Sequence, residues 1–293
     1  MTQKTAPTRS RRTGWPLGSL IAVVLLFAGC SGNSTALTST TTTLPRTTTT
    51  TAPGSTTTTT TPGQRTYPLY FLRGAELGVS QRVVTSATDA HYQAITALMG
   101  GTTPTESAAG LSTEIPPGTT VRGLAIHGGI ATVNLSPEFV AVGSPVQLSG
   151  RLAQVVYTLT NSPTVTQVVI EIAGSRIVNF AGVNLANPVG RSQVTAALPL
   201  VLLEQPAVGG SLKGVLTISG LTAGPGTYDV QLLDPTGKLL ASVTNTAAAG
   251  GTFLQSIPFT ISGPETGTVR VFGRPTSTSQ PVQSFQFTLP IAP

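Results

Sequence analysis

The 293-residue sequence predicts two folded domains of different class, preceded by an N-terminal region with no fold of its own. Residues 67–198 mix short apolar runs with helical periodicity, which predicts an α/β (α+β) domain. Residues 199–293 change to a period of two between Gly, Pro and Asp turns, which predicts an all-β sandwich. Charged residues make up only 9% of the chain, which excludes a highly charged disordered protein.

The first 30 residues have the pattern of an export signal. Four basic side chains and no acidic one precede residues 17–28, which are all apolar or small. This segment is shorter than the roughly 20 residues that a membrane-spanning helix needs, and its basic-then-apolar order is typical of a signal peptide. Because Ser10-Arg11-Arg12 is similar to a twin-arginine signal, both the Sec and the twin-arginine export routes stay open.

The apolar segment ends in Leu26-Phe27-Ala28-Gly29-Cys30, which resembles the lipobox of bacterial lipoproteins. The resemblance implies that Cys30 becomes the lipidated N-terminus of the mature chain. Two or more acyl chains, such as palmitate, hold a protein stably on a bilayer, so we expect anchoring to the extracytoplasmic face of the cell membrane. Since Cys30 is the only cysteine, the chain has no disulfide framework and no Cys-cluster zinc site. The alternative is an ordinary signal peptide with a cysteine there by chance.

Residues 31–66 are predicted to form a disordered tether. Residues 35–61 contain 17 Thr together with Pro45 and Pro53, and they offer almost no apolar surface to bury. Thr-rich tracts with Pro resemble O-glycosylated stalks. A plain spacer and a glycosylated stalk both fit this composition.

The α/β domain is predicted to begin with two short strands, residues 67–72 and 82–85. Ser86-x-x-Asp89 resembles a helix capping box, and the following helix has Tyr92, Ile95, Leu98 and Met99 on one face. Gly100-Gly101 is predicted to end that helix, and residues 102–118 are predicted to be a loop.

A β-hairpin is expected next, with strands at 119–126 and 130–135 joined by His127-Gly128-Gly129. A second helix is predicted to begin after Ser144, which serves as its N-cap, with Pro145 in its first turn. Its apolar side chains follow a helical spacing, at Leu148, Leu152, Val155, Val156 and Leu159. Residues 165–173 complete the domain as a further strand.

Four segments of this domain, in order, resemble the GerMN family of sporulation, spore-germination and envelope lipoproteins. They are Ile115-Pro116-Pro117-Gly118-Thr119, Ile130-Ala131-Thr132-Val133-Asn134-Leu135-Ser136, Gln154-Val155-Val156-Tyr157-Thr158-Leu159-Thr160 and Val165-x-x-Val168. The likeness covers roughly residues 67–180. It implies a small α/β domain used in envelope assemblies, with no catalytic residues to carry over.

Seven strands are predicted in the second domain, at residues 199–204, 212–218, 227–233, 237–244, 253–261, 267–273 and 282–289. Apolar residues of one parity are expected to face the core, among them Phe253, Ile257, Val269, Val271 and Phe287. Asp234-Pro235-Thr236-Gly237 is predicted to be a turn. Together with Gln205-Pro206, Thr217-Ile218-Ser219-Gly220 and Pro258-Phe259, the pattern resembles the immunoglobulin-like domain that often follows GerMN. Ala223-Gly224-Pro225-Gly226-Thr227 departs from that family.

Catalytic motifs are absent from the sequence. There is no HExxH zinc motif, no GxSxG nucleophile and no phosphate-binding loop. His91 is expected to be an exposed residue of a first helical turn and His127 a residue of a surface turn. Glu106 and Glu114 are a conceivable carboxylate pair for glycoside cleavage, but both fall in the predicted loop. We therefore predict no enzyme activity, no cofactor and no metal.

The charge distribution limits the partners. From Thr66 onward ten basic side chains balance ten acidic ones, so the excess of positive charge belongs to the targeting region and nucleic acid is not expected as a partner. We predict a non-catalytic, membrane-anchored envelope lipoprotein that binds an envelope protein or the cell wall as a scaffold or accessory. The alternatives are a solute-binding lipoprotein and a wall-processing enzyme. Oligomerisation is possible, and the outer faces and edges of the sheets are the expected contact surfaces.

Overall fold

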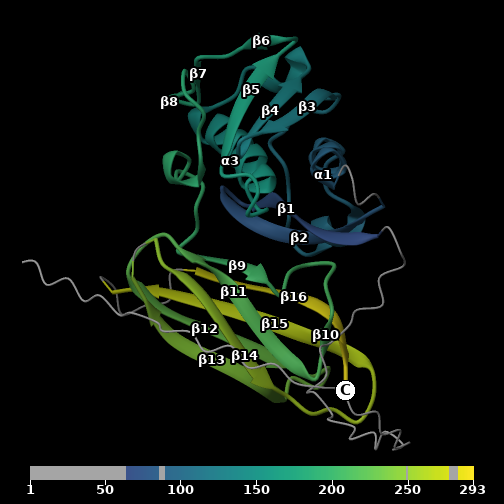
Figure 1. Ribbon diagram of the computed structural model, residues 1–293. Coiled ribbons are helices and arrows are strands. Elements are labelled where there is room, and N and C mark those ends of the chain that lie inside the picture. The colour runs from purple at the N-terminus through teal and green to yellow at the C-terminus, as the bar shows by residue number, and fades with distance from the viewer. Residues whose placement is uncertain (1–63, 86–89, 249, 277–282) are drawn as a thin grey trace, which may run out of the picture. The chain divides into compact units, whose positions relative to one another are not determined.

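The computed structural model describes residues 64–85, 90–248, 250–276 and 283–293 (Figure 1). The predicted signal peptide, Cys30, most of the tether and the capping box at Ser86 and Asp89 lie outside the described residues. The described chain is mostly β-structure with few helices. We refer to β1 through η2 as the α/β part and to β9 through β16 as the sandwich. None of the described helices is long and apolar enough to cross a membrane.

The α/β part opens with an antiparallel hairpin of β1 (Arg65–Arg73) and β2 (Glu76–Val84). The first strand is confirmed, whereas the second starts six residues before the predicted position. Gly78 interrupts the apolar run there and obscured the strand. It is needed for close packing, because a Cβ atom on it would lie 2.6 Å from the Leu111 Cδ2 atom.

Helix α1 (Ala90–Met99) buries Ile95, Leu98 and Met99 as predicted. The placement of Tyr92 on that face is wrong, since its side chain is 42% exposed. Ala94 is fully buried and shifts the centre of the buried face away from Tyr92. The helix ends at Gly100-Gly101, and Gly101 has a φ of +77°.

The predicted loop at 102–118 contains a short helix, α2 (Pro104–Ala108), which is a correction to the sequence analysis. The Thr103 side chain accepts a hydrogen bond from the Glu106 backbone N–H, and the Glu106 carboxylate accepts one from the Thr103 N–H. This reciprocal capping box specifies the helix. Five residues are too few to show a helical period in a sequence.

A second sheet has the order β3-β4-β5-β6, with ranges β3 (Val121–His127), β4 (Ile130–Leu135), β5 (Gln167–Ile172) and β6 (Ser175–Arg176). The predicted hairpin is confirmed, with Gly128 and Gly129 at φ +56° and +81° in its turn. β5 is parallel to β4, and the crossover carries η1 (Pro137–Val140) and α3 (Pro145–Leu159). Ser144 caps α3 as predicted, with Gln147 completing a capping box.

The α/β part ends in the small pair β7 (Asn179–Phe180) and β8 (Val183–Asn184) and the turn η2 (Arg191–Gln193). Phe180 stacks on the buried Phe139 ring at a centroid distance of 5.4 Å. This contact ties the irregular segment after β6 to the crossover before α3.

All seven predicted strands of the sandwich are present, and a short eighth strand, β10, precedes β11. Their ranges are β9 (Val201–Gln205), β10 (Leu212–Lys213), β11 (Val215–Thr222), β12 (Gly226–Leu233), β13 (Leu239–Ala247), β14 (Thr252–Pro258), β15 (Glu265–Pro275) and β16 (Gln283–Ala292). They form two sheets, β10-β16-β15-β12-β13 and β14-β11-β9. Tyr228 of one sheet stacks on Phe253 of the other at 4.5 Å.

The predicted alternation is confirmed on β15 and β16, where Val269, Val271, Phe287 and Leu289 are buried, whereas Phe253 and Ile257 of β14 are half-buried and pack against the core. Between β12 and β13, the Asp234 carboxylate accepts hydrogen bonds from the Thr236 and Lys238 N–H groups at 2.8 and 2.9 Å. Between β9 and β11, the pairing register shifts at Gly220. A Cβ atom on Gly220 would lie 2.1 Å from the Leu202 carbonyl oxygen, so the bulge brings two backbones into direct contact.

Candidate functional site

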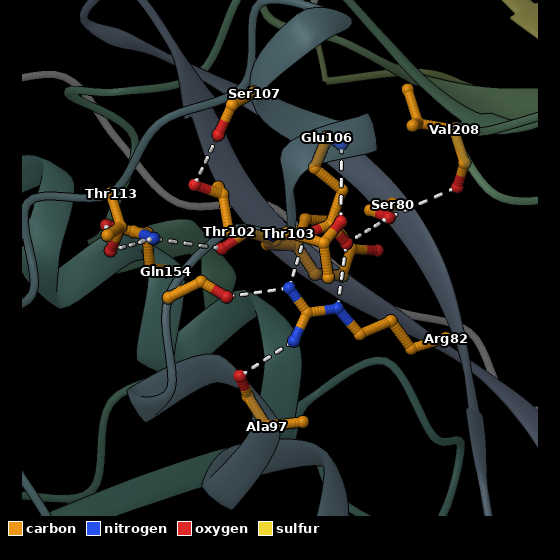
Figure 2. A network of polar contacts seen from close by, with 12 residues as sticks. Ser80, Arg82, Ala97, Thr102, Thr103, Glu106, Ser107, Thr113, Gln154 and Val208 are labelled. Atoms are coloured by element: carbon orange, nitrogen blue, oxygen red, sulfur yellow. Dashed lines mark hydrogen bonds and ion pairs between the residues drawn. The ribbon is translucent and has the colours of Figure 1, made fainter.

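The densest polar cluster of the described chain surrounds an ion pair between Arg82 of β2 and Glu106 of α2 (Figure 2). Arg82 Nε donates to Glu106 Oε1 at 2.8 Å, and Arg82 Nη2 contacts the other carboxylate oxygen. Two further guanidinium hydrogens are donated to the carbonyl oxygens of Ala97 at 3.0 Å and Gly101 at 2.6 Å. Arg82 therefore binds α2 and the last turn of α1 at once.

Glu106 is 3% exposed and has further donors. Ser80 Oγ donates to its carboxylate at 2.6 Å, and the Thr103 N–H donates at 2.6 Å. Burial alone would raise the pKa of Glu106, but the hydrogen bonds from Arg82, Ser80 and Thr103 outweigh burial and hold the pKa below its ordinary value. A carboxylate held ionised and enclosed in this way cannot serve as a proton donor to a substrate.

A second cluster is centred on Arg191 of η2. Its Nη1 donates to Glu204 Oε1 at 2.8 Å, and its Nη2 donates to the Tyr70 hydroxyl at 2.9 Å. The guanidinium carbon lies 4.7 Å from the ring centroid of Tyr157 and 5.2 Å from that of Tyr70. Burial, followed by the charge of Glu204, raises the pKa of Tyr70 well above its ordinary value, so its hydroxyl keeps its proton and donates to Glu204.

Both clusters join chain segments that are distant in sequence. The Arg191 cluster connects β1, α3, η2 and β9, and the Ser80 hydroxyl of the first cluster, which bonds to Glu106, also lies 3.2 Å from the Val208 carbonyl oxygen. Each polar atom named in these contacts is hydrogen-bonded to another atom of the protein. The clusters thus stabilise the fold.

The structure separates the residues that the sequence made candidates for catalysis. Glu106 is buried on a helix, while the main chain of Glu114 bonds to Gln154 and Arg151 in another network. His127 is exposed at the end of β3, as expected. The expectation that His91 is exposed is wrong, because it is half-buried and packs edge-on against Tyr67 at 5.6 Å.

Burial lowers the pKa of His91, and its buried Nε2 atom has no hydrogen-bond partner among the described residues. No group of three or more His, Cys, Asp or Glu side chains that could hold a metal occurs in the described ranges. Cys30, the predicted lipidation site, lies outside them.

A comparison with protein-family models finds one match in the α/β part. Residues 68–178 match the family described as Germane: Sporulation and spore germination. Residues 68–178 form a GerMN-type domain. The resemblance to the GerMN family is confirmed by this match, which covers the hairpin β1–β2, both main helices and the sheet β3-β4-β5-β6.

Solved structures give weaker likenesses. The first GerMN domain of the sporulation protein GerM from Bacillus subtilis is 20% identical, with 44% of this chain and 98% of that one covered and a TM-score of 0.36. The tandem GerMN domains of the same protein are 17% identical, with 64% and 62% covered and a TM-score of 0.41. A candidate lipoprotein of Clostridium perfringens is 20% identical, with 47% and 95% covered and a TM-score of 0.34.

The identification of the GerMN-type domain rests on the family match, since all three TM-scores are below 0.5. No curated protein matches the chain.

Sequence reasoning missed the three arginines that organise the GerMN-type domain and its C-terminal extension, Arg82, Arg151 and Arg191. For Arg151 a signal was present, because it is the only charged residue of helix α3. Its guanidinium donates to the carbonyl oxygens of Glu114, Phe139 and Ala141 at 2.9, 2.6 and 2.9 Å. No comparable signal marks Arg82 and Arg191 in the sequence, because their ion-pair partners Glu106 and Glu204 are 24 and 13 residues away.

Proposed function

We propose that the chain is a non-catalytic envelope lipoprotein. In this proposal it is exported, anchored to the extracytoplasmic face of the cell membrane by acyl groups on Cys30, and extended on its Thr-rich tether. Its folded part binds another envelope protein or the cell wall as a scaffold or an assembly accessory. The observation that carries the proposal is the match of residues 68–178 to a family described by sporulation and spore germination.

The side-chain chemistry supports a binding role over a catalytic one. The buried carboxylate of Glu106 is paired with Arg82, and the hydroxyl of Tyr70 is hydrogen-bonded to Arg191 and Glu204. A wall-processing enzyme needs a carboxylic acid that can exchange a proton with substrate, and neither cluster offers one. A solute-binding lipoprotein usually has two similar lobes around a cleft, and the two halves here differ in class.

The anchoring step is tested by replacing Cys30 with Ser in the full-length chain. We expect the variant to lose labelling by an acyl probe and to leave the detergent phase in a partition experiment. Thr38→Ser, a conservative change in the tether, is the matched control and should keep both properties. Equal labelling of the Cys30 variant and the wild type would refute the lipoprotein assignment.

The binding step is tested in cells by crosslinking and pulldown of the anchored chain. The expected result is a defined envelope protein or wall fragment that is recovered with the wild type and with a variant lacking residues 35–61. Recovery of a small solute alone, or turnover of wall material by the purified chain, would favour the alternatives.

A further inference from the structure

The outer face of the five-stranded sheet of the sandwich is a polar surface with one aromatic ring at its centre. Along β12 and β15, Val230, Val269 and Val271 point inward and are fully buried. The alternate side chains point away from the core and are half-buried or exposed. On β12, β13, β15 and β16 these outward residues include Thr227, Asp229, Gln231, Ser242, Thr244, Arg270, Phe272, Arg274, Ser284 and Gln286.

The strand register brings these side chains into rows. Asp229 is paired with Thr244 on one side and with Phe272 on the other. Gln231 is paired with Arg270, and Thr227 with Arg274. Arg270, Phe272 and Arg274 therefore follow one another at alternate positions of β15, about 7 Å apart at the Cα level. Along the strand, Phe272 therefore lies between the two arginines.

Hydrogen bonds fix several of these groups in place. Gln231 Nε2 donates to Asp229 Oδ2 at 2.6 Å, and Thr244 Oγ1 donates to Asp229 Oδ1 at 3.1 Å. Arg270 Nε donates to Gln286 Oε1 at 3.1 Å. Among the described residues neither Arg270 nor Arg274 has an ion-pair partner, because the two ion pairs found there are Arg82–Glu106 and Arg191–Glu204.

This face is hollowed beside the ring. A depression of about 250 Å³ is lined by Thr227, Asp229, Thr244, Phe272 and Arg274, with main chain from Tyr228 and Gly273. At about 30 Å³ per water molecule in the liquid, it has room for about eight waters, which suits one sugar ring. Its lining combines an aromatic surface, hydroxyl groups, a fixed carboxylate and a guanidinium.

The chemistry of the face selects among ligand classes. Protein interfaces are usually centred on large apolar side chains, but of the exposed large apolar residues of the sandwich Val215 and Leu254 belong to the other sheet, and Leu239 lies at the start of β13, paired with Leu233 and not with the row around Phe272. Thr hydroxyls and Gln amides suit a ligand rich in hydroxyl groups, and an aromatic ring suits the C–H face of a sugar. The two guanidinium groups carry two positive charges, against the single negative charge of Asp229, whose carboxylate is already hydrogen-bonded. A guanidinium group forms paired hydrogen bonds with a carboxylate.

We propose that this face binds a glycan strand whose sugars carry carboxylates. One sugar ring occupies the depression against Phe272, and carboxylates of the strand pair with Arg274 and Arg270. The inference rests on the proposed binding role and deepens it by naming the class of wall component and the face that takes it. The pairing of its carboxylates with the two arginines orients the glycan strand along β15.

Binding of polygalacturonate to the full-length chain in detergent, measured by calorimetry, tests the inference. Arg274→Gln is expected to weaken binding about tenfold, the usual effect of losing a hydrogen bond to a charged group. Lys238→Gln removes the same charge from the turn between β12 and β13 and should leave the affinity unchanged. Dextran, a neutral glycan, should bind at least about tenfold more weakly than polygalacturonate.

Several results would overturn the proposal. One is that polygalacturonate does not bind, and another is that dextran binds as tightly as polygalacturonate. A third is that Lys238→Gln weakens binding as much as Arg274→Gln does. A fourth is that single-stranded DNA binds more tightly than polygalacturonate and depends equally on Arg274, which would indicate a general polyanion surface. Arg274 is exposed, and thermal melting of Arg274→Gln checks that the variant is folded.

The two proposals can fail separately. If Arg274→Gln loses polygalacturonate binding and the wild type gives crosslinks in cells, both proposals stand. If polygalacturonate never binds while the crosslinks are present, only the glycan inference fails.

Discussion

The α/β part and the sandwich are stabilised by different kinds of buried group. Among the described residues, all but one of the buried polar or charged side chains lie in the α/β part: Ser80, Glu106, Thr119, Ser136, Arg151, Gln154 and Thr158. The sandwich contributes only Thr222. The first region therefore depends on specific hydrogen bonds between distant segments, and the second on alternating apolar burial.

Gln154 illustrates the first kind of stabilisation. This fully buried side chain accepts a hydrogen bond from the Glu114 N–H at 3.0 Å and donates to the Tyr70 carbonyl oxygen at 3.4 Å. It joins α3, β1 and the segment after α2 through one amide. Such a contact is costly to lose, because a buried polar group without a partner is destabilising.

The largest expected effect comes from breaking the buried ion pair of the α/β part. Glu106→Ala leaves the Arg82 guanidinium without its counter-charge, and we expect a loss of about 3–5 kcal/mol in the free energy of unfolding. Urea denaturation measures it. The double variant Arg82→Met/Glu106→Leu should regain most of the loss because no charge is then left unpaired. A loss below about 1 kcal/mol for Glu106→Ala would contradict a structural role for the pair.

The same ion pair gives the α/β part a dependence on acid. Because the pKa of Glu106 is lowered in the folded state, its stabilisation is complete above the ordinary carboxyl pKa and is lost as pH falls through the folded value. Wild type should therefore lose more stability than Glu106→Gln between pH 5 and pH 3, roughly the range in which carboxyl groups titrate. Parallel stability curves for the two proteins would refute this assignment.

A comparable effect without pH dependence is expected in the sandwich. Leu232 is fully buried, and Leu232→Ala should cost about 2–5 kcal/mol through lost apolar contacts and the remaining cavity. The loss should be the same at pH 4 and pH 7. A loss that changes with pH would show that the sandwich also relies on titrating groups, which would weaken the contrast between the two regions.

A smaller effect is expected for Glu204→Gln. Glu204 and Arg191 keep 22% and 25% of their side-chain surface exposed, so water compensates part of the lost charge. We expect a loss of about 1 kcal/mol by thermal melting. Lys213→Gln, a single-charge change in the same half of the chain, is the control. A loss of stability as large as that of Glu106→Ala would show that the Arg191 cluster contributes as much to the free energy of unfolding as the Arg82 cluster does.

The smallest expected effect concerns His91. Burial lowers its pKa, so the folded state resists protonation and stability falls as pH decreases below the ordinary value of 6.5. His91→Phe should remove this decrease while keeping the contact with Tyr67. An unchanged decrease in the His91→Phe variant would contradict the role of His91.

The contrast also explains how far sequence reasoning reaches. Most of the main strands of the sandwich were predictable because they alternate buried and exposed residues over their own length, and β9 was predictable as a short apolar run, with Val201, Leu202 and Leu203 all buried. In the α/β part the hairpin β3–β4 and helix α3 were predictable from a Gly-Gly turn and a Ser-Pro start. Helix α2 was not, since five residues are too few to show a helical period, and the burial of Glu106 depends on Arg82, 24 positions earlier.

The candidate sites follow the same rule. The sequence could identify Cys30 as a lipidation candidate because that motif is local. It could not identify Arg191, which acquires its surroundings only when Tyr70, Tyr157 and Glu204 come together. Nor did it identify the row Arg270, Phe272 and Arg274, because the side chains that surround an outward residue come from the neighbouring strands.

The bulge at Gly220 limits how this sandwich can diverge over evolution. Any side chain at that position would collide with the Leu202 carbonyl and with the Phe253 ring, 2.1 and 2.7 Å from the added Cβ. A substitution there can survive only if β9 moves at the same time. Position 220 should therefore tolerate almost no single change in a mutational scan, while the neighbouring Ser219, which faces outward, should accept many.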